Sequence, residues 1–287
     1  MEGEDARRIV LTYSILARDP ETGQLGGAVQ SRAFNCGSGV LWAHPGVGVV
    51  ATQSYAERSY GPLGLELLQA GKTPEQALAA LVTADPDASV RQVAILAADG
   101  SAAAHTGDDC IPDAGHHIGD GYSVQANIMR DASVWPAMAE AFEKGSGSLA
   151  RRLLGALDTA EGVGGDWRGM QAAGLLVVAP DAKPWESLVD LRVDDHPEPL
   201  RELRRLLDLH DGYTAVFEGE ERGQAARGFG MDDLDVRIAD LLDAAHAGEV
   251  PRAGALLEPL LAEEPRWADY IRALGRRGLL PHADELV

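Results

Sequence analysis

The sequence predicts an α+β protein built from layers of antiparallel strands and paired helices. Short segments rich in β-branched and apolar residues follow one another in runs joined by turn residues, and pairs of amphipathic helices stand between these runs. The regular alternation of strand and helix that indicates a parallel sheet is absent. With 287 residues, 45% of them hydrophobic, the chain has room for one main domain and a smaller companion.

The predicted strands begin with a hairpin near the N-terminus. Residues 9–18 and 25–31 are rich in apolar and β-branched residues, and Pro20 and Gly23 between them are typical of a turn. A second hairpin is predicted over residues 92–106, where an Asp-Gly pair forms the turn. The other predicted strands are residues 46–53, 122–128, 172–178 and 188–193.

The predicted helices occur mainly in pairs. The first pair consists of residues 62–70 and a helix that opens at Thr73, with Pro74 in its first turn and Gln76 completing a capping box. The second pair and a final helix have apolar side chains at helical spacing. These helices are predicted at residues 134–144, 149–161 and 199–209.

Beyond residue 212 the composition of the chain changes. Residues 218–230 contain four glycines, many charges and few large apolar residues, which is typical of a loop or linker. The leucines that follow recur at helical spacing. We therefore predict a linker at residues 213–231 and a small all-helical domain at residues 232–287.

Composition excludes several classes of partner. The chain has 45 acidic and 25 basic residues and a net charge of −20, which disfavours nucleic acids and anionic membranes because both require a basic face. No apolar run is long enough to span a membrane and the first residues lack a signal-peptide pattern, so a cytoplasmic location is expected. Metal and nucleotide motifs are absent, so neither metal nor cofactor is expected. Cys36 and Cys110 are expected to be buried thiols.

Two polar segments contain candidate site residues with more than one interpretation. Two-residue spacing places Gln125 and Asn127 on one face of a strand, where they are either ordinary polar residues or donors to a substrate carbonyl or oxyanion. Asp166 and Arg168 follow two glycines that allow close backbone approach. They either pair with each other in a tight turn or bind a ligand.

His116 lies in a third polar segment, residues 108–117, which contains two adjacent histidines and three carboxylates. A metal site is a weak interpretation, because the side chains of neighbouring residues on an extended chain point apart. A polar surface loop is the simpler prediction.

Several motifs spread in order over residues 10–212 resemble one known family. They include residues 12–23 (Thr-Tyr-Ser-Ile-Leu-Ala-Arg-Asp-Pro-Glu-Thr-Gly), 46–53, 60–64, 110–112, 125–127, 164–169 and 191–197. Together they resemble the DUF1028 family, which is assigned to the Ntn-hydrolase-like fold. The C-terminal part, especially residues 265–281, resembles the peptidoglycan-binding-like domain often attached to this family.

The resemblance implies a four-layer αββα sandwich and an N-terminal nucleophile, here Thr12, whose own α-amino group acts as the base. Eleven residues precede Thr12, so a free amine requires cleavage between Leu11 and Thr12. Residues 1–11 are then an extension or propeptide of a domain spanning residues 12–212. Arg32 is expected to keep the pKa of the new amine low.

Two hypotheses for the function remain open. In the first, the chain is an amide-bond hydrolase of unknown substrate, a small molecule or a peptide-like compound; Thr12 attacks, Asn127 and Gln125 stabilise the oxyanion, and Asp166 or Arg168 orients the amine or the substrate. In the second, the scaffold is non-catalytic and binds a ligand or mediates assembly. A homo-oligomer, most simply a dimer, is expected. The predicted catalytic residues are Thr12, Asn127 and Asp166, and the predicted substrate-binding residues are Arg32, Gln125, His116 and Arg168.

Overall fold

The computed structural model describes residues 9–219 and 221–287. It divides into two compact units, the first ending at Arg204 and the second beginning at Arg205. The first unit contains all of the described strands, and the second is built from helices. The division falls within helix α7 (Pro199–Glu218), which is longer than the helix predicted to end at residue 209. Residues 1–8 of the predicted extension lie outside the described residues.

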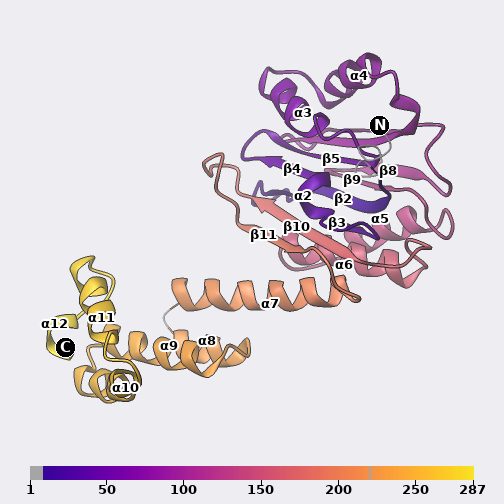
Figure 1. Ribbon diagram of the computed structural model, residues 1–287. Coiled ribbons are helices and arrows are strands. Elements are labelled where there is room, and N and C mark those ends of the chain that lie inside the picture. The colour runs from indigo at the N-terminus through magenta and orange to yellow at the C-terminus, as the bar shows by residue number, and fades with distance from the viewer. Residues whose placement is uncertain (1–8, 220) are drawn as a thin grey trace. The chain divides into compact units, whose positions relative to one another are not determined.

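The described strands form two antiparallel sheets (Figure 1). The first sheet contains β1 (Ile9–Val10), β4 (Leu41–His44), β5 (Gly48–Tyr55), β6 (Arg91–Ala97) and β7 (Ala102–Thr106). The second contains β2 (Thr12–Arg18), β3 (Leu25–Ser31), β8 (Gly115–Gly119), β9 (Tyr122–Ala126), β10 (Ala172–Val178) and β11 (Val189–Val193). The first sheet has the order β1-β5-β6-β7, with β4 also paired to β5, and the second has the order β11-β10-β3-β2-β9-β8.

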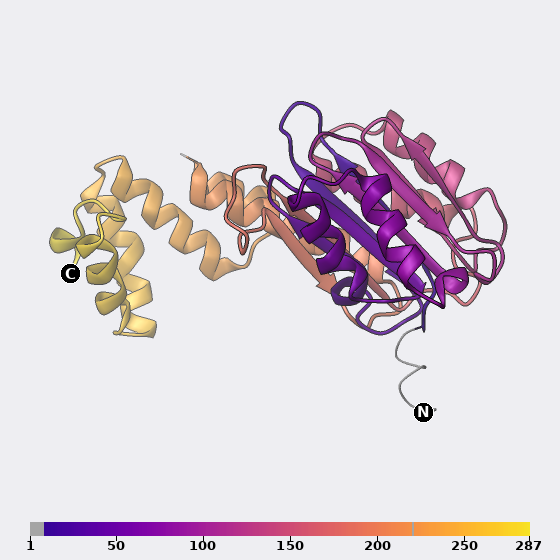
Figure 2. The ribbon, with the colours of Figure 1, turned by 90° about the horizontal axis from the view of Figure 1, so that it is seen from above.

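Each sheet is contacted by its own pair of helices. Helices α3 (Tyr60–Gln69) and α4 (Pro74–Ala84) contact the first sheet, and Figure 2 shows them lying over its strands. Helices α5 (Val134–Lys144) and α6 (Leu149–Gly162) contact the second sheet. The two sheets contact each other through β2 and β5. Two short helical segments complete the connections: α2 (Gly37–Val40) lies between β3 and β4, and η2 (Ala88–Val90) lies between α4 and β6.

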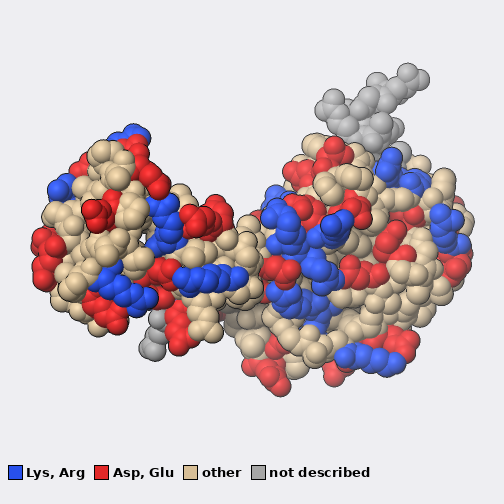
Figure 3. Space-filling view, turned by 90° about the horizontal axis from the view of Figure 1, so that it is seen from below, with Lys and Arg blue, Asp and Glu red and all other residues tan. Residues whose placement is uncertain are grey.

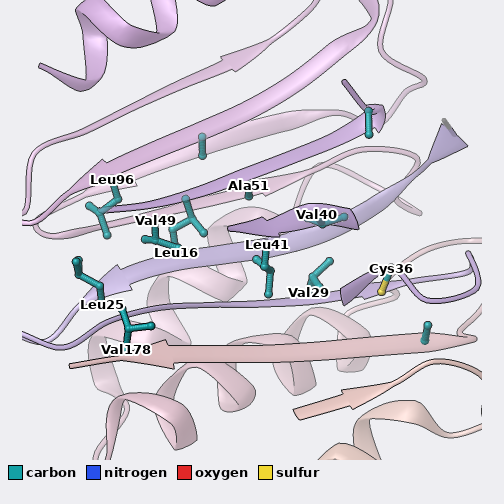
Figure 4. Close-up of a cluster of buried hydrophobic side chains, with 13 residues drawn as sticks. Leu16, Leu25, Val29, Cys36, Val40, Leu41, Val49, Ala51, Leu96 and Val178 are labelled. Carbon is teal, nitrogen blue, oxygen red and sulfur yellow. The ribbon is translucent and has the colours of Figure 1, made fainter. Parts of the chain in front are cut away.

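Strand β2 illustrates how the sequence assigns side chains to the two faces of its sheet. Successive side chains of a strand point to opposite faces. Leu16 is fully buried in an apolar cluster that also contains Val49 and Leu96 of the first sheet (Figure 4). The hydroxyl of Tyr13 lies on the other face and donates to Glu161 of α6 at 3.0 Å. Burying one large apolar side chain such as Leu16 contributes about 1.5–3 kcal/mol.

Several local predictions are confirmed. The predicted hairpins are the pairs β2–β3 and β6–β7, and Thr73 and Gln76 form both hydrogen bonds of the capping box. Strands β4 and β8 were not predicted. The second of these corrects only the end of the loop predicted over residues 108–117: residues 108–114 lie outside any strand or helix, whereas residues 115–117 belong to β8, which pairs with β9 and packs against Trp135 of α5. A side chain at Gly115 would collide with this indole, at 2.5 Å.

The second unit contains helices over residues 232–287, as the sequence predicts. Residues 218–230, which were predicted to form a loop, also contain a helix. Helix α8 (Arg222–Gly228) forms there because a carboxylate distant in sequence caps it: Asp243 accepts from the backbone N–H groups of Arg222 and Gly223 at 3.0 and 2.8 Å. That cap is invisible in the local sequence. The helices after α7 are α8 (Arg222–Gly228), α9 (Asp233–His246), α10 (Val250–Glu263), α11 (Trp267–Arg276) and α12 (Ala283–Leu286).

The second unit has its own apolar core and a mixed charged surface. Leu241, Leu257 and Ile271 come from three of its helices and belong to one buried cluster. Acidic and basic side chains lie beside one another on the face shown in Figure 3. Among the helices that the structure describes, none combines the length and the apolar character that crossing a bilayer requires.

Candidate functional site

Polar residues gather where strands of the two sheets meet at one edge. In antiparallel pairs the start of one strand lies beside the end of the next, so the start of β2 lies beside the ends of β3 and β9. In the first sheet, the start of β6 lies beside the ends of β5 and β7. Residues distant in sequence, among them Thr12 and Gln92, are thereby brought to the same edge.

Thr12 begins β2 and is fully buried. Its backbone N–H donates to Asn127 Oδ1 at 3.3 Å, and its hydroxyl donates to the carbonyl of Gln30. The N–H of Asn127 in turn donates to the Thr12 carbonyl at 3.0 Å. The nitrogen of Thr12 belongs to a peptide bond here, and Asn127 holds it by its side-chain oxygen.

The carbonyl oxygen of Leu11, which precedes Thr12, accepts two side-chain hydrogen bonds. The hydroxyl of Ser31 and the Arg168 guanidinium each donate to it at 2.7 Å. Arg168 is held in place by Asp166, which accepts from its Nε at 3.0 Å and from its Nη2 at 2.6 Å. The side chain of Asp166 is completely buried, and that of Arg168 is 23% exposed. One charge-assisted donor and one hydroxyl therefore polarise the Leu11–Thr12 peptide bond.

The turn that carries this ion pair explains its position. Gly164 and Gly165 before it have positive φ values of 126° and 50°, a conformation that side chains other than glycine rarely adopt. Asp166 then forms an isolated antiparallel bridge with Met129, just beyond β9. The turn therefore brings Arg168 to the start of β2, where Thr12 and Asn127 meet.

A chain of buried carboxamides links the two sheets beside Thr12. Gln53 of β5 donates to Gln92 Oε1 at 2.7 Å and accepts from the Ser14 hydroxyl at 2.6 Å. Gln125 donates to the same hydroxyl at 2.7 Å, and Asn127 donates to Gln92 Oε1 at 2.9 Å. Because these buried polar groups hydrogen-bond one another, their burial costs little free energy, and the bonds fix the positions of the side chains.

The network continues from Gln92 to a polar cavity. Gln92 donates to the Thr106 hydroxyl at 2.9 Å, and this hydroxyl lies 2.8 Å from His116 Nδ1. His116, Cys110 and Trp135 are among the residues that line a cavity of about 600 Å³.

Burial favours the neutral form of two titratable groups at this cavity, His116 and Cys110. Burial lowers the pKa of His116, and the neighbouring His105 and His117 lower it further. Burial also raises the pKa of the Cys110 thiol. Around neutral pH the cavity therefore presents an uncharged imidazole and an uncharged thiol. Within residues 9–219 and 221–287, no three His, Cys, Asp or Glu side chains gather closely enough to hold a metal ion.

The structure brings together most of the residues that the sequence singled out. Thr12, Asn127, Asp166 and Arg168 surround one peptide bond, and Asp166 and Arg168 pair in a tight turn. Gln125 joins the same network through Ser14, and His116 joins it through Thr106.

Arg32, which was expected beside the Thr12 amine, has a different partner. Its side chain is exposed and donates to the carbonyl of Met170 at 2.8 Å. Ser31, Gln53 and Gln92 were not singled out as site residues. Ser31 lies at the end of a predicted strand and in a segment, residues 28–32, that shares the family resemblance, but neither signal reveals the neighbouring strand.

The protein is of the mixed α/β class, with two antiparallel sheets that are each contacted by a pair of helices. Buried polar residues lie at one edge of these sheets. The chain belongs to the DUF1028 family, described as a family of unknown function, whose model matches residues 12–203. A crystal structure of a DUF1028 protein from Silicibacter pomeroyi is 37% identical with a TM-score of 0.63, and the match covers 69% of this chain and 88% of that chain.

A second solved structure is similar only at a low level. Anbu (ancestral beta-subunit) from Yersinia bercovieri is 15% identical with a TM-score of 0.33, and the match covers 72% of this chain and 97% of that chain. This likeness is too low to carry an argument. No curated protein matches the chain.

Proposed function

We propose that this protein is an amide-bond hydrolase of the N-terminal-nucleophile type, activated by cleavage between Leu11 and Thr12. The observation that carries the proposal is the pair of donors, Ser31 and Arg168, on the carbonyl of Leu11. The family match begins at residue 12, which also supports a boundary at this bond. The helices that contact each sheet are compatible with the four-layer αββα arrangement of such hydrolases.

Cleavage at this bond would begin with attack of the Thr12 hydroxyl on the Leu11 carbonyl carbon. The Thr12 oxygen forms an ester bond to Leu11, the peptide C–N bond breaks, and the hydroxyl proton ends on the Thr12 nitrogen. A water molecule then hydrolyses the ester, giving a Leu11 carboxylate and restoring the hydroxyl. Ser31 and Arg168 stabilise the negative charge that develops on the carbonyl oxygen in both steps.

Cleavage would leave Thr12 with a free α-amine as well as its hydroxyl. An α-amine has an unperturbed pKa of about 7.7–8.0, so roughly a tenth of it is unprotonated at pH 7 and able to accept a proton. Asn127 Oδ1, which already accepts from this nitrogen, would orient the amine. Asp166 acts as a positioning residue, since it touches Arg168 rather than the reacting atoms. In this assignment Asn127 binds the amine, and Ser31 and Arg168 stabilise the oxyanion.

The test is the mass and N-terminal sequence of the purified protein. We expect a species that begins at Thr12, and we expect Thr12→Ala to remain uncleaved while unfolding at nearly the same temperature. Thr12→Ser, which keeps a hydroxyl nucleophile, is the matched control and should still be cleaved. A wild-type chain that stays intact after prolonged incubation at neutral pH would exclude this mechanism.

A further inference from the structure

We propose that the acyl half of the substrate is a peptide that ends in a large aliphatic residue and binds as a strand along the edge of β5. The proposal rests on the proposed function and adds the substrate class. It starts from the residues that now occupy the acyl side of the bond before Thr12, namely Ile9, Val10 and Leu11.

The backbone of residues 9 and 10 already uses the edge of β5 as a strand partner. β6 pairs with β5 along Gly48–Ser54, while β4 pairs only with residues 48–51 of β5. Strand β1 pairs with Tyr55 and Ser54 at the far end of β5. When β1 leaves, this end loses a backbone partner, and an extended peptide can restore the pairing.

The carbonyl of Leu11 occupies the place that a substrate carbonyl must take. The ester between Leu11 and the Thr12 oxygen, formed during cleavage, is the same linkage that a substrate acyl group forms during turnover. The groups that hold this carbonyl, Ser31 and Arg168, therefore act on both. The chain's own segment thus marks where the acyl half of a substrate lies.

The side chain of Leu11 defines the preferred residue at the scissile bond. It is only 4% exposed, so the protein encloses a branched aliphatic group at this position. The adjacent charges, Asp166 and Arg168, are already paired with each other. A charged side chain placed where Leu11 lies would lose its water without gaining a free partner, and binding would weaken.

Peptide binding to the cleaved wild-type protein tests this proposal. The probe is dye-labelled Ile-Val-Leu with a free carboxylate, the product of the cleavage, and its affinity is read by fluorescence polarisation. We expect the matched Ile-Val-Asp peptide to bind roughly 100-fold more weakly. We also expect Ile-Val-Leu with methylated backbone nitrogens to bind more weakly, because methylation removes strand donors.

Cleavage of the full chain supplies a second, independent measurement. Leu11→Met should be cleaved within about threefold of the wild-type rate, since a volume-conserving apolar exchange is tolerated. Leu11→Asp should be cleaved roughly 100-fold more slowly. Circular dichroism verifies that both variants fold, and the peptide measurement stands if Leu11→Asp does not.

The outcomes separate the two proposals. A wild-type chain that is never cleaved overturns the proposed function, and the substrate assignment with it. A cleaved chain that binds the Leu and Asp peptides equally, or binds neither, leaves the hydrolase in place and overturns the aliphatic peptide. Equal cleavage of a folded Leu11→Asp chain would likewise count against the enclosed aliphatic position.

Discussion

The space between the two sheets has an apolar end and a polar end, and strand β2 contributes to both. Leu16 lies in the apolar cluster, whereas Ser14, two residues earlier on the same face, hydrogen-bonds Gln53 of the facing sheet. The strands and their alternation continue without interruption from one end to the other. The apolar end stabilises the fold by burying apolar surface, which does not depend on direction. The polar end fixes the orientation of its side chains through directional hydrogen bonds. The same layer can therefore stabilise the fold at one end and position the Leu11–Thr12 bond at the other.

The largest expected effect is on cleavage, at the polar end. Ser31→Ala removes one of the two donors to the Leu11 carbonyl and should slow cleavage roughly 100-fold to 1,000-fold, as for other oxyanion donors. The measurement is the fraction of cleaved chain against time by mass spectrometry. Ser101→Ala, whose hydroxyl bonds only Asp99 in an exposed turn, is the matched control and should be cleaved at the wild-type rate. Equal rates for both variants would contradict the role of Ser31.

A second effect concerns the buried ion pair. Asp166→Asn leaves the Arg168 guanidinium without its carboxylate and should lower the free energy of unfolding by about 3 kcal/mol, as when one partner of a buried pair is removed. Asp190→Asn is the control, because Asp190 and Arg192 are 39% and 44% exposed and such a pair contributes about 0–1 kcal/mol. Urea unfolding of the two variants measures both changes. Similar losses of unfolding free energy in the two variants would show that the more buried ion pair does not contribute more to stability.

Two substitutions that lower the free energy of unfolding by comparable amounts distinguish residues that only stabilise the fold from residues that also position the Leu11–Thr12 bond. Leu16→Ala in the apolar cluster should lower the free energy of unfolding by about 2–5 kcal/mol without slowing cleavage. Gln92→Met deprives several buried groups of partners, at roughly 1–3 kcal/mol each, and should also slow cleavage because Asn127 loses its anchor. The pair of measurements is the unfolding midpoint and the cleavage rate. Slow cleavage in the folded Leu16→Ala variant would remove the distinction between the two ends.

The smallest expected effect is the pH dependence from His116. Its pKa is lowered in the folded protein, so the unfolded chain binds the proton more readily. Stability attributable to His116 is therefore complete above its unfolded pKa of about 6.5 and falls as the pH decreases below that value. Replacing His116 with Gln should reduce this loss between neutral and acidic pH, as thermal unfolding in a pH series would reveal. An unchanged slope would contradict the assignment.

The sequence predicted features that depend on neighbouring residues and missed those that depend on distant ones. The capping box of Thr73 lies within four residues, and it was predicted correctly. Helix α8 depends on Asp243 in the following helix, and its segment was predicted as a loop. The site follows the same division: Asp166 and Arg168 were noticed because they are two residues apart. Ser31 acquires its partner only when β3 is placed beside β2, which no local pattern reveals.

The two cysteines lie in different surroundings. Cys36 belongs to the apolar cluster and Cys110 lines the cavity beside His116; both are free, and burial raises the pKa of each thiol. The Cys36 thiol can react with an alkylating reagent only after its surroundings open, whereas Cys110 already borders the cavity. Labelling kinetics at Cys36 would therefore give the opening free energy of the apolar cluster, with Cys110 as a reference thiol in the same unmodified protein.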